Sequence, residues 1–109
     1  MTELFIKMPY LLEIKSGKKT VEARANYSNL RKIQEGQEVV FVSGSLRVNV
    51  IVERISLYKS VDEMLENEEI DTLIPGANFE EALTIYNSIY PPDKVKKNNG
   101  MRVFSIKLM

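Results

Sequence analysis

Residues 17–24, GKKTVEAR, hold three side chains that could bind or transform a polar ligand: Lys19, Glu22 and Arg24. The ammonium of Lys19 could hold a phosphate or a carbonyl oxygen, and a lysine desolvated beside another cation can act as a base. The carboxylate of Glu22 can accept hydrogen bonds from the exocyclic amine of a nucleobase, and the guanidinium of Arg24 can bind phosphate or stack on a base. The same pattern also fits a solvated strand, where an ion pair contributes about 0–1 kcal/mol, so both interpretations stand.

A hydroxyl nucleophile follows directly after Lys19. In a strand, Thr20 would share a face with Glu22 and Arg24, because side chains alternate with a period of two. Lysine can activate a neighbouring hydroxyl group, so Thr20 is a candidate nucleophile. Threonine is also a common strand residue, which gives Thr20 an equally simple structural explanation.

The composition removes several classes of chemistry. The 109 residues include no cysteine and no histidine, which excludes disulfides, thiolate zinc sites and catalysis by Ser-His-Asp or Cys-His groups. No stretch resembles a calcium-binding DxDxDG loop, and we expect neither a metal nor a cofactor. Lys+Arg and Asp+Glu number 15 each, so the chain should not coat duplex nucleic acid indiscriminately, and any anion site must be a local patch.

Charge is unevenly distributed along the chain. Between residues 13 and 35, six basic side chains outnumber three acidic ones. Tyr10 and Tyr27 flank this region and could stack on bases, and Arg31 lies within it. Four more basic side chains could form a second basic edge: Lys94, Lys96, Lys97 and Arg102. Both groups could also be ordinary surface charge.

Residues 62–71 hold six acidic side chains and no basic ones. An acidic segment would repel a long phosphate backbone, so it favours a pocket for one base over a site that binds an extended strand.

The hydrophobic pattern predicts the strands that must position these residues. They cover residues 2–7, 19–25, 38–44, 45–58 and 101–108. Within residues 45–58 the inward-facing parity changes near Glu53 and Arg54. Either a β-bulge or a break into two strands would explain that change.

Helix signals lie between the predicted strands. One helix begins at Pro9 and ends before Gly17. Ser60 with Glu63, and Asn78 with Glu81, are capping-box pairs that predict helices over residues 60–69 and 78–90. The paired prolines at 91 and 92 end the last of these, and residues 93–100 read as a polar loop or turn.

Together these elements predict an α+β fold, a small and partly open β-barrel of about five strands with two or three short helices. A chain of this length is expected to form a single domain, residues 1–109. It has no apolar run of 18 residues and no signal-peptide pattern. We therefore expect a cytoplasmic protein that does not bind membranes. As a separate expectation, the protein is a monomer or weak dimer.

In that context the spacing G-x-K-x-x-E-x-R, formed by Gly17, Lys19, Glu22 and Arg24, resembles the signature of the ASCH domains, a branch of the PUA-like β-barrel superfamily. Four segments resemble the family in the right order: LEIKSGKKTVEAR, IQEGQEVVFV, ISLYKSVDEMLENEEI and EEALTIYNSIYP. The resemblance covers nearly the whole chain. It implies a mixed or antiparallel barrel whose signature strand lines a cleft that is proposed to bind RNA or nucleotides.

Some small bacterial members of the family hydrolyse the acetyl amide of N4-acetylcytidine with a lysine, a threonine and a glutamate. The resemblance matches the lysine to Lys19. It matches the glutamate best to Glu68, or to Glu66 or Glu69 if a gap shifts the alignment. The family's threonine stands where this chain has Glu22, so the chain departs from the hydrolytic pattern at that position.

The resulting hypothesis is a protein that binds RNA, a nucleotide or a nucleoside in the cleft. The candidate binding residues are Lys19, Glu22, Arg24, Tyr10, Tyr27 and Arg31. The first alternative is an amidohydrolase of the N4-acetylcytidine type, using Lys19, Thr20 or water, and Glu22 or Glu68. The second alternative is an adaptor domain whose cleft is vestigial.

Overall fold

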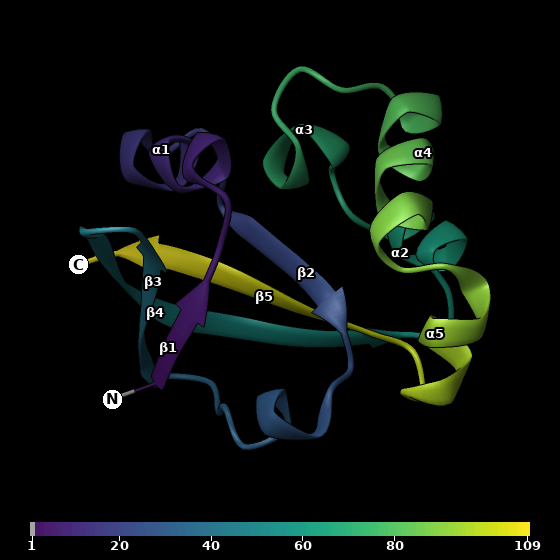
Figure 1. Cartoon of the computed structure of the whole chain (residues 1–109), viewed down its shortest axis with the longest axis horizontal. Helices are drawn as coiled ribbons and strands as arrows, with labels where there is room; N and C mark the ends of the chain where they lie inside the picture. The colour runs from purple at the N-terminus through teal and green to yellow at the C-terminus, as the bar shows by residue number, and fades with distance from the viewer. Residues whose placement is uncertain (1) are drawn as a thin grey trace.

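The computed structural model of the protein describes residues 2–109. Five strands form one sheet in the order β1-β3-β4-β5-β2, which curls into a half-barrel (Figure 1). The strands are β1 (Thr2–Phe5), β2 (Val21–Ala25), β3 (Glu38–Ser43), β4 (Leu46–Tyr58) and β5 (Met101–Leu108). β1 runs parallel to β3, and the other neighbouring pairs are antiparallel. The predicted α+β fold with a mixed five-stranded sheet is confirmed, and β1 and β2 are its two free edges.

The change of parity in the longest strand is a β-bulge. β4 runs without a break, but its register with β5 shifts between Val52 and Arg54, which leaves Glu53 without a partner residue. The carboxylate of Glu35 accepts a hydrogen bond from the amide of Ile55 at 2.9 Å, just beyond the bulge. A bulge bends the strand and increases its twist, so it helps the sheet to curl.

The structure contains more helices than the sequence predicted. The described residues form α1 (Met8–Ser16), the 3-10 turn η1 (Ser28–Leu30), α2 (Val61–Asn67), α3 (Ile70–Leu73), α4 (Phe79–Ile89) and α5 (Pro92–Lys97). The predicted helices correspond to α1, α2 and α4, and Asn78 and Glu81 form the expected capping box. The prediction of two or three helices was too low, because α3 and α5 are one or two turns long and carry little hydrophobic periodicity.

The helix α5 replaces the polar loop predicted for residues 93–100. Pro92 follows the end of α4 and begins α5, since proline is favoured in the first turn of a helix, where its missing N–H is not needed. Val95 anchors the helix, with only 2% of its surface exposed. The paired prolines therefore separate two helices rather than ending the helical region.

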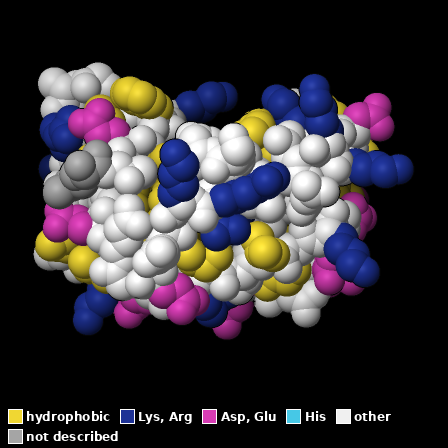
Figure 2. Space-filling model, turned by 90° about the horizontal axis from the view of Figure 1, so that it is seen from below, with side chains coloured by type: hydrophobic (Ala, Val, Ile, Leu, Met, Phe, Trp, Pro, Cys, Tyr) yellow, Lys and Arg dark blue, Asp and Glu magenta, His cyan; other side chains and the backbone are white. Residues whose placement is uncertain are grey.

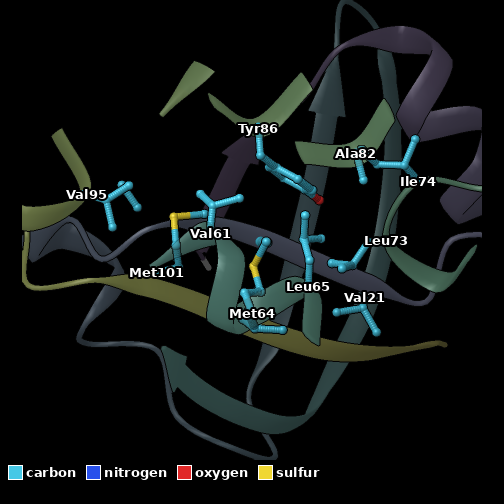
Figure 3. Close-up of a cluster of buried hydrophobic side chains, with 13 residues drawn as sticks. Val21, Val61, Met64, Leu65, Leu73, Ile74, Ala82, Tyr86, Val95 and Met101 are labelled. Carbon is cyan, nitrogen blue, oxygen red and sulfur yellow. The ribbon is translucent and has the colours of Figure 1, made fainter. Parts of the chain in front are cut away.

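Two hydrophobic clusters cover the two faces of the sheet. One lies inside the curled sheet under α1 and includes Phe41 and Phe104. The other lies between the sheet and α2–α5, and Figure 3 shows its side chains, among them Met64, Tyr86 and Met101. The side chains of β2 point alternately to the two faces of the sheet. Those of its odd-numbered residues belong to the cluster under the helices.

Gly100 is required at the turn that leads into β5. Its φ is +108°, and a Cβ atom there would lie 2.2 Å from the carbonyl oxygen of Tyr58. We predict that Gly100→Ala lowers the free energy of unfolding by more than about 3 kcal/mol, because backbone strain adds to a clash with a rigid β4 carbonyl. Urea denaturation measures the loss.

The matched control is Gly76→Ala. Gly76 also has a positive φ, +84°, but a Cβ atom there would meet nothing within 4 Å. This control should lose only about 1–2 kcal/mol, the cost of the left-handed backbone. Equal losses in the two variants would contradict the role assigned to the Tyr58 carbonyl.

Candidate functional site

The two free sheet edges enclose a cavity. No ladder joins β1 to β2, and a cavity of about 190 Å³ lies along this seam between them. Its walls come from the junction of β1 and α1, from β2, from α3 and from α4. Its charged and aromatic polar side chains include Tyr10, Lys19, Glu22, Arg24, Tyr86 and Tyr90. The seam therefore brings together residues that are far apart in sequence.

Lys19 is a buried cation, with only 3% of its surface exposed. Its ammonium donates hydrogen bonds to the carbonyl oxygens of Val21 and Leu73, each at 2.7 Å. It also lies 3.1 Å from Oε1 of Glu22. Three acceptors match the three protons of an ammonium group, so Lys19 ties the start of β2 to the end of α3 and has no proton left to donate.

Glu22 is held from both sides. Its Oε1 faces Lys19, and its Oε2 lies 2.9 Å from Nε of Arg24. Burial alone would raise the pKa of Glu22, but the charges and hydrogen bonds of Lys19 and Arg24 together lower it below its ordinary value. Glu22 is therefore an ionised carboxylate at neutral pH, and it lines the cavity.

Arg24 joins the two sheet edges. Its Nη2 donates a hydrogen bond to the carbonyl oxygen of Phe5 at 2.7 Å, across the seam from β2 to β1. Its guanidinium lies over the ring of Phe41, 6.0 Å from the ring centre. A cation over an aromatic face is stabilised by the quadrupole of the ring. Arg24 thus closes part of the seam and fixes one oxygen of Glu22.

The backbone of Ala23 presents a free donor and a free acceptor to the cavity. At the two ends of the β2–β5 ladder, the amide of Ile106 donates a hydrogen bond to the carbonyl oxygen of Thr20, and the amide of Asn26 donates one to the carbonyl oxygen of Gly100. Hydrogen-bonded pairs alternate with non-bonded pairs in an antiparallel ladder. The N–H and C=O of Ala23 therefore point away from β5, and no partner for either occurs in residues 2–109.

Tyr86 of α4 and Tyr90, the residue directly after that helix, complete the polar lining. Burial, followed by the charge of Glu22, raises the pKa of Tyr86 well above its ordinary value. The same two causes, in the same order, raise the pKa of Tyr90 to about 12. Both phenols are therefore neutral at physiological pH and can donate or accept a hydrogen bond. Both tyrosines lie within the helix predicted over residues 78–90, but nothing in the sequence singled them out, so their role at the cavity was missed.

The remaining predicted residues occupy different places. Tyr10 lines the cavity, and the ammonium of Lys19 lies 5.9 Å from the centre of its ring. Tyr27 packs on Tyr90 with ring centres 6.4 Å apart, but it is outside the cavity lining. Thr20 precedes β2 and lines a separate hollow on the other side of Lys19.

The acidic candidates after α2 are also outside the lining. Glu68 accepts hydrogen bonds from Arg54 and from the hydroxyl of Tyr58, in a cluster of its own. Glu66 and Glu69 are exposed. Residues 2–109 bring together no group of three or more acidic side chains that could hold a metal ion. In the same range, no helix has the length and apolar character needed to cross a membrane.

Comparisons place this architecture among known proteins. The family model described as ASCH domain matches residues 4–105. The fold is similar to the crystal structure of hypothetical protein PH0355, with 32% identity, a TM-score of 0.88, and coverage of 98% of this chain and 97% of that one. It is also similar to the solution NMR structure of protein PF0455 from Pyrococcus furiosus, with 31% identity, a TM-score of 0.79, and coverage of 99% and 96%. No curated protein matches. The chain belongs to the ASCH domain family.

Proposed function

We propose that the protein binds a single base, as part of RNA or of a free nucleotide or nucleoside, in the cavity between β1 and β2. The observation that carries this proposal is Glu22, an ionised carboxylate that is 7% exposed and lines a cavity. A structural ion pair needs only one partner, whereas Glu22 is fixed by two cations on two sides. An adaptor domain with a vestigial cleft would more simply leave Lys19 and Glu22 in solvent.

The cavity offers hydrogen-bonding groups that complement the edge of a base. Each oxygen of Glu22 keeps a lone pair beyond its contact with Lys19 or Arg24, and can accept from ring or exocyclic N–H groups. The N–H and C=O of Ala23 add a neighbouring donor and acceptor. The rings of Tyr10 and Tyr90 provide aromatic surface on which a base can stack.

The size of the cavity favours a ligand no larger than one base. Its volume of about 190 Å³ is below the ~300–1,000 Å³ of pockets that enclose drug-sized ligands. A base inserted between the sheet edges would leave its sugar and phosphate outside. This agrees with unstacked single bases as the usual targets of sequence-specific RNA recognition.

The positions of the candidate catalytic groups favour binding over amide hydrolysis. The three contacts of the Lys19 side-chain nitrogen are all made within the protein, so none of them is directed at a substrate in the cavity. Thr20 and Glu68 lie outside the lining. Hydrolysis of N4-acetylcytidine is therefore a separate outcome to be measured, with chromatography to detect cytidine.

The first test is a panel of nucleosides, nucleoside monophosphates and short single-stranded RNAs, followed by two-dimensional NMR. We predict that Glu22→Gln weakens binding of the best ligand about 10- to 100-fold, because a hydrogen bond to a charged group contributes about 1.5–3 kcal/mol. The matched control is Glu68→Gln. The side chain of Glu68 is also only 5% exposed and is paired with an arginine, but its replacement should leave the dissociation constant unchanged. Absence of binding by every member of the panel would refute the proposal.

The second test concerns Lys19 as the residue that positions Glu22. We predict that Lys19→Met lowers the free energy of unfolding by about 3–5 kcal/mol, since it leaves a buried carboxylate without one of its partners. The double variant Lys19→Met, Glu22→Leu should recover most of that loss, because the uncompensated charge is gone. Urea denaturation of the single and double variants measures the coupling, and additive losses would rule out this role.

The pH dependence of the wild type follows from the same interaction. The pKa of Glu22 is lower in the folded state than the ordinary value of 4.5. Its contribution to stability is therefore complete above pH 4.5 and is lost as the pH falls through the lower folded-state value. Glu22→Gln should lack this part of the acid-induced loss.

The third test addresses the backbone of Ala23. We predict that its amide proton exchanges with solvent faster than those of Glu22 and Arg24, whose amides face β5. The bound ligand should slow exchange at Ala23 by up to about tenfold, the effect of one added hydrogen bond of about 1 kcal/mol. Hydrogen-exchange NMR of the free and bound protein measures this directly. An Ala23 amide that is as protected as its neighbours without ligand would contradict the assigned ladder orientation.

A further inference from the structure

Arg102 lies directly across the β2–β5 ladder from Arg24. The two residues form a hydrogen-bonded pair by the alternation described above, so their Cα atoms lie about 5.5 Å apart and their side chains emerge on the same face. Arg24 lines the cavity, whereas Arg102 is one strand further from the seam and half-buried. Arg102 therefore lies on the face of the sheet from which Arg24 reaches the cavity, one strand further away.

The guanidinium of Arg102 has few partners in the described part of the chain. Within residues 2–109 it donates a single hydrogen bond, from Nη1 to Oδ1 of Asn26, at a long 3.4 Å. Its Nε is buried and has no partner. Buried polar groups nearly always have hydrogen-bond partners, so such an exception needs an explanation. A guanidinium group carries five N–H donors. With one weak contact, most of the donors of Arg102 have no partner within residues 2–109.

A second guanidinium converges on the same asparagine. Nε and Nη2 of Arg31 donate to the carbonyl oxygen of Asn26 at 3.1 and 2.9 Å, and Nη2 also donates to that of Asn98 at 3.1 Å. Among residues 2–109, neither Arg31 nor Arg102 forms an ion pair with a carboxylate. Burial, and then the charge of Arg31, lowers the pKa of Arg102. Two cations thus lie near each other without a compensating anion.

The surrounding surface has the same sign of charge. The last turn of α5, which precedes Asn98, carries three lysines and no acidic residue: Lys94, Lys96 and Lys97. Seen from the side of η1 and α5, the molecule has Lys and Arg side chains in the middle of its face, and Asp and Glu side chains mostly nearer the edges (Figure 2). An anion that reaches this face meets a positive field.

We infer that Arg102 and Arg31 form a phosphate-binding subsite, which receives the phosphate of the nucleotide whose base occupies the cavity; this inference rests on the proposed function. Guanidinium groups bind phosphate through two parallel hydrogen bonds. The bound phosphate would supply the missing anion between the two cations. The ligand is then a phosphorylated species, either a free nucleotide or an RNA chain, in preference to a free nucleoside.

The test compares four ligands carrying the base that binds best: the nucleoside, its 5′-monophosphate, its 3′-monophosphate, and an RNA dinucleotide. We expect at least one phosphorylated form to bind about tenfold or more tightly than the nucleoside. Arg102→Gln should remove that advantage and leave the affinity for the nucleoside unchanged. A preference for the dinucleotide over both monophosphates would identify RNA as the source of the phosphate.

The matched control is Arg47→Gln. Arg47 is an exposed arginine paired with Glu3, and its replacement should not change the affinity ratio between phosphorylated and unphosphorylated ligands. The salt dependence gives an independent readout, because loss of one phosphate contact lowers the slope of log affinity against log salt by about one. A merely structural arginine would leave that slope unchanged.

Stability separates a binding role from a structural one. Arg102 is poorly satisfied in the protein alone, so Arg102→Gln should keep or raise the midpoint temperature of unfolding. A marked fall in that temperature, with an equal loss of affinity for nucleoside and nucleotide, would overturn the inference.

Inorganic phosphate distinguishes failure of this inference from failure of the proposed function. Titration of phosphate should shift the side-chain Nε–H signal of Arg102 in an NMR spectrum. If that signal shifts while no nucleoside or nucleotide affects Glu22 or Ala23, the phosphate subsite stands and the proposed function fails. If nucleosides bind, but phosphorylation adds no affinity and phosphate causes no shift, the proposed function stands and the subsite is refuted.

Discussion

The buried carboxylate of Glu22 is the interaction on which the rest of the site depends. A charge removed from water must be compensated by partners of opposite charge and by hydrogen bonds. Lys19 and Arg24 provide that compensation, and each also binds a backbone carbonyl of another element, that of Leu73 in α3 or of Phe5 in β1. The bonds that stabilise the charge therefore also hold the walls of the cavity in place.

The cavity itself follows from the topology of the sheet. β1 joins the sheet only through its parallel pairing with β3, and β2 only through its antiparallel pairing with β5. The strand order leaves these two edges facing each other without a ladder, so backbone groups at the seam are available for a ligand. A fully closed barrel would have used them in strand pairing. The backbone groups to which we assign ligand binding are therefore those that incomplete closure of the barrel leaves without strand partners.

Local patterns in the sequence pointed to the charged residues that line the cavity, but not to the rest of its lining. Strand alternation put Glu22 and Arg24 on one face, and the structure has them there. The same rule included Thr20, but β2 begins at Val21, and strand ends depend on tertiary pairing. The orientation of the Ala23 backbone depends on which ladder pairs with β5 are hydrogen-bonded, and side-chain types do not encode this. Tyr86 could not be separated from a core residue, because a cavity wall and a core share the same helical spacing.

The unpaired edge of β2 has a second consequence, for self-association. A strand edge with free N–H and C=O groups is a template on which another chain can add a strand, and natural proteins protect such edges with charges or by covering them. Here the edge around Ala23 is recessed beneath α3 and α4, and it is flanked by the side chains of Lys19 and Arg24. A flat base can enter this recess, whereas an extended strand would have to displace the Arg24 bridge to Phe5. The recess that we propose for a base thus also hinders edge-to-edge pairing between copies of the open barrel.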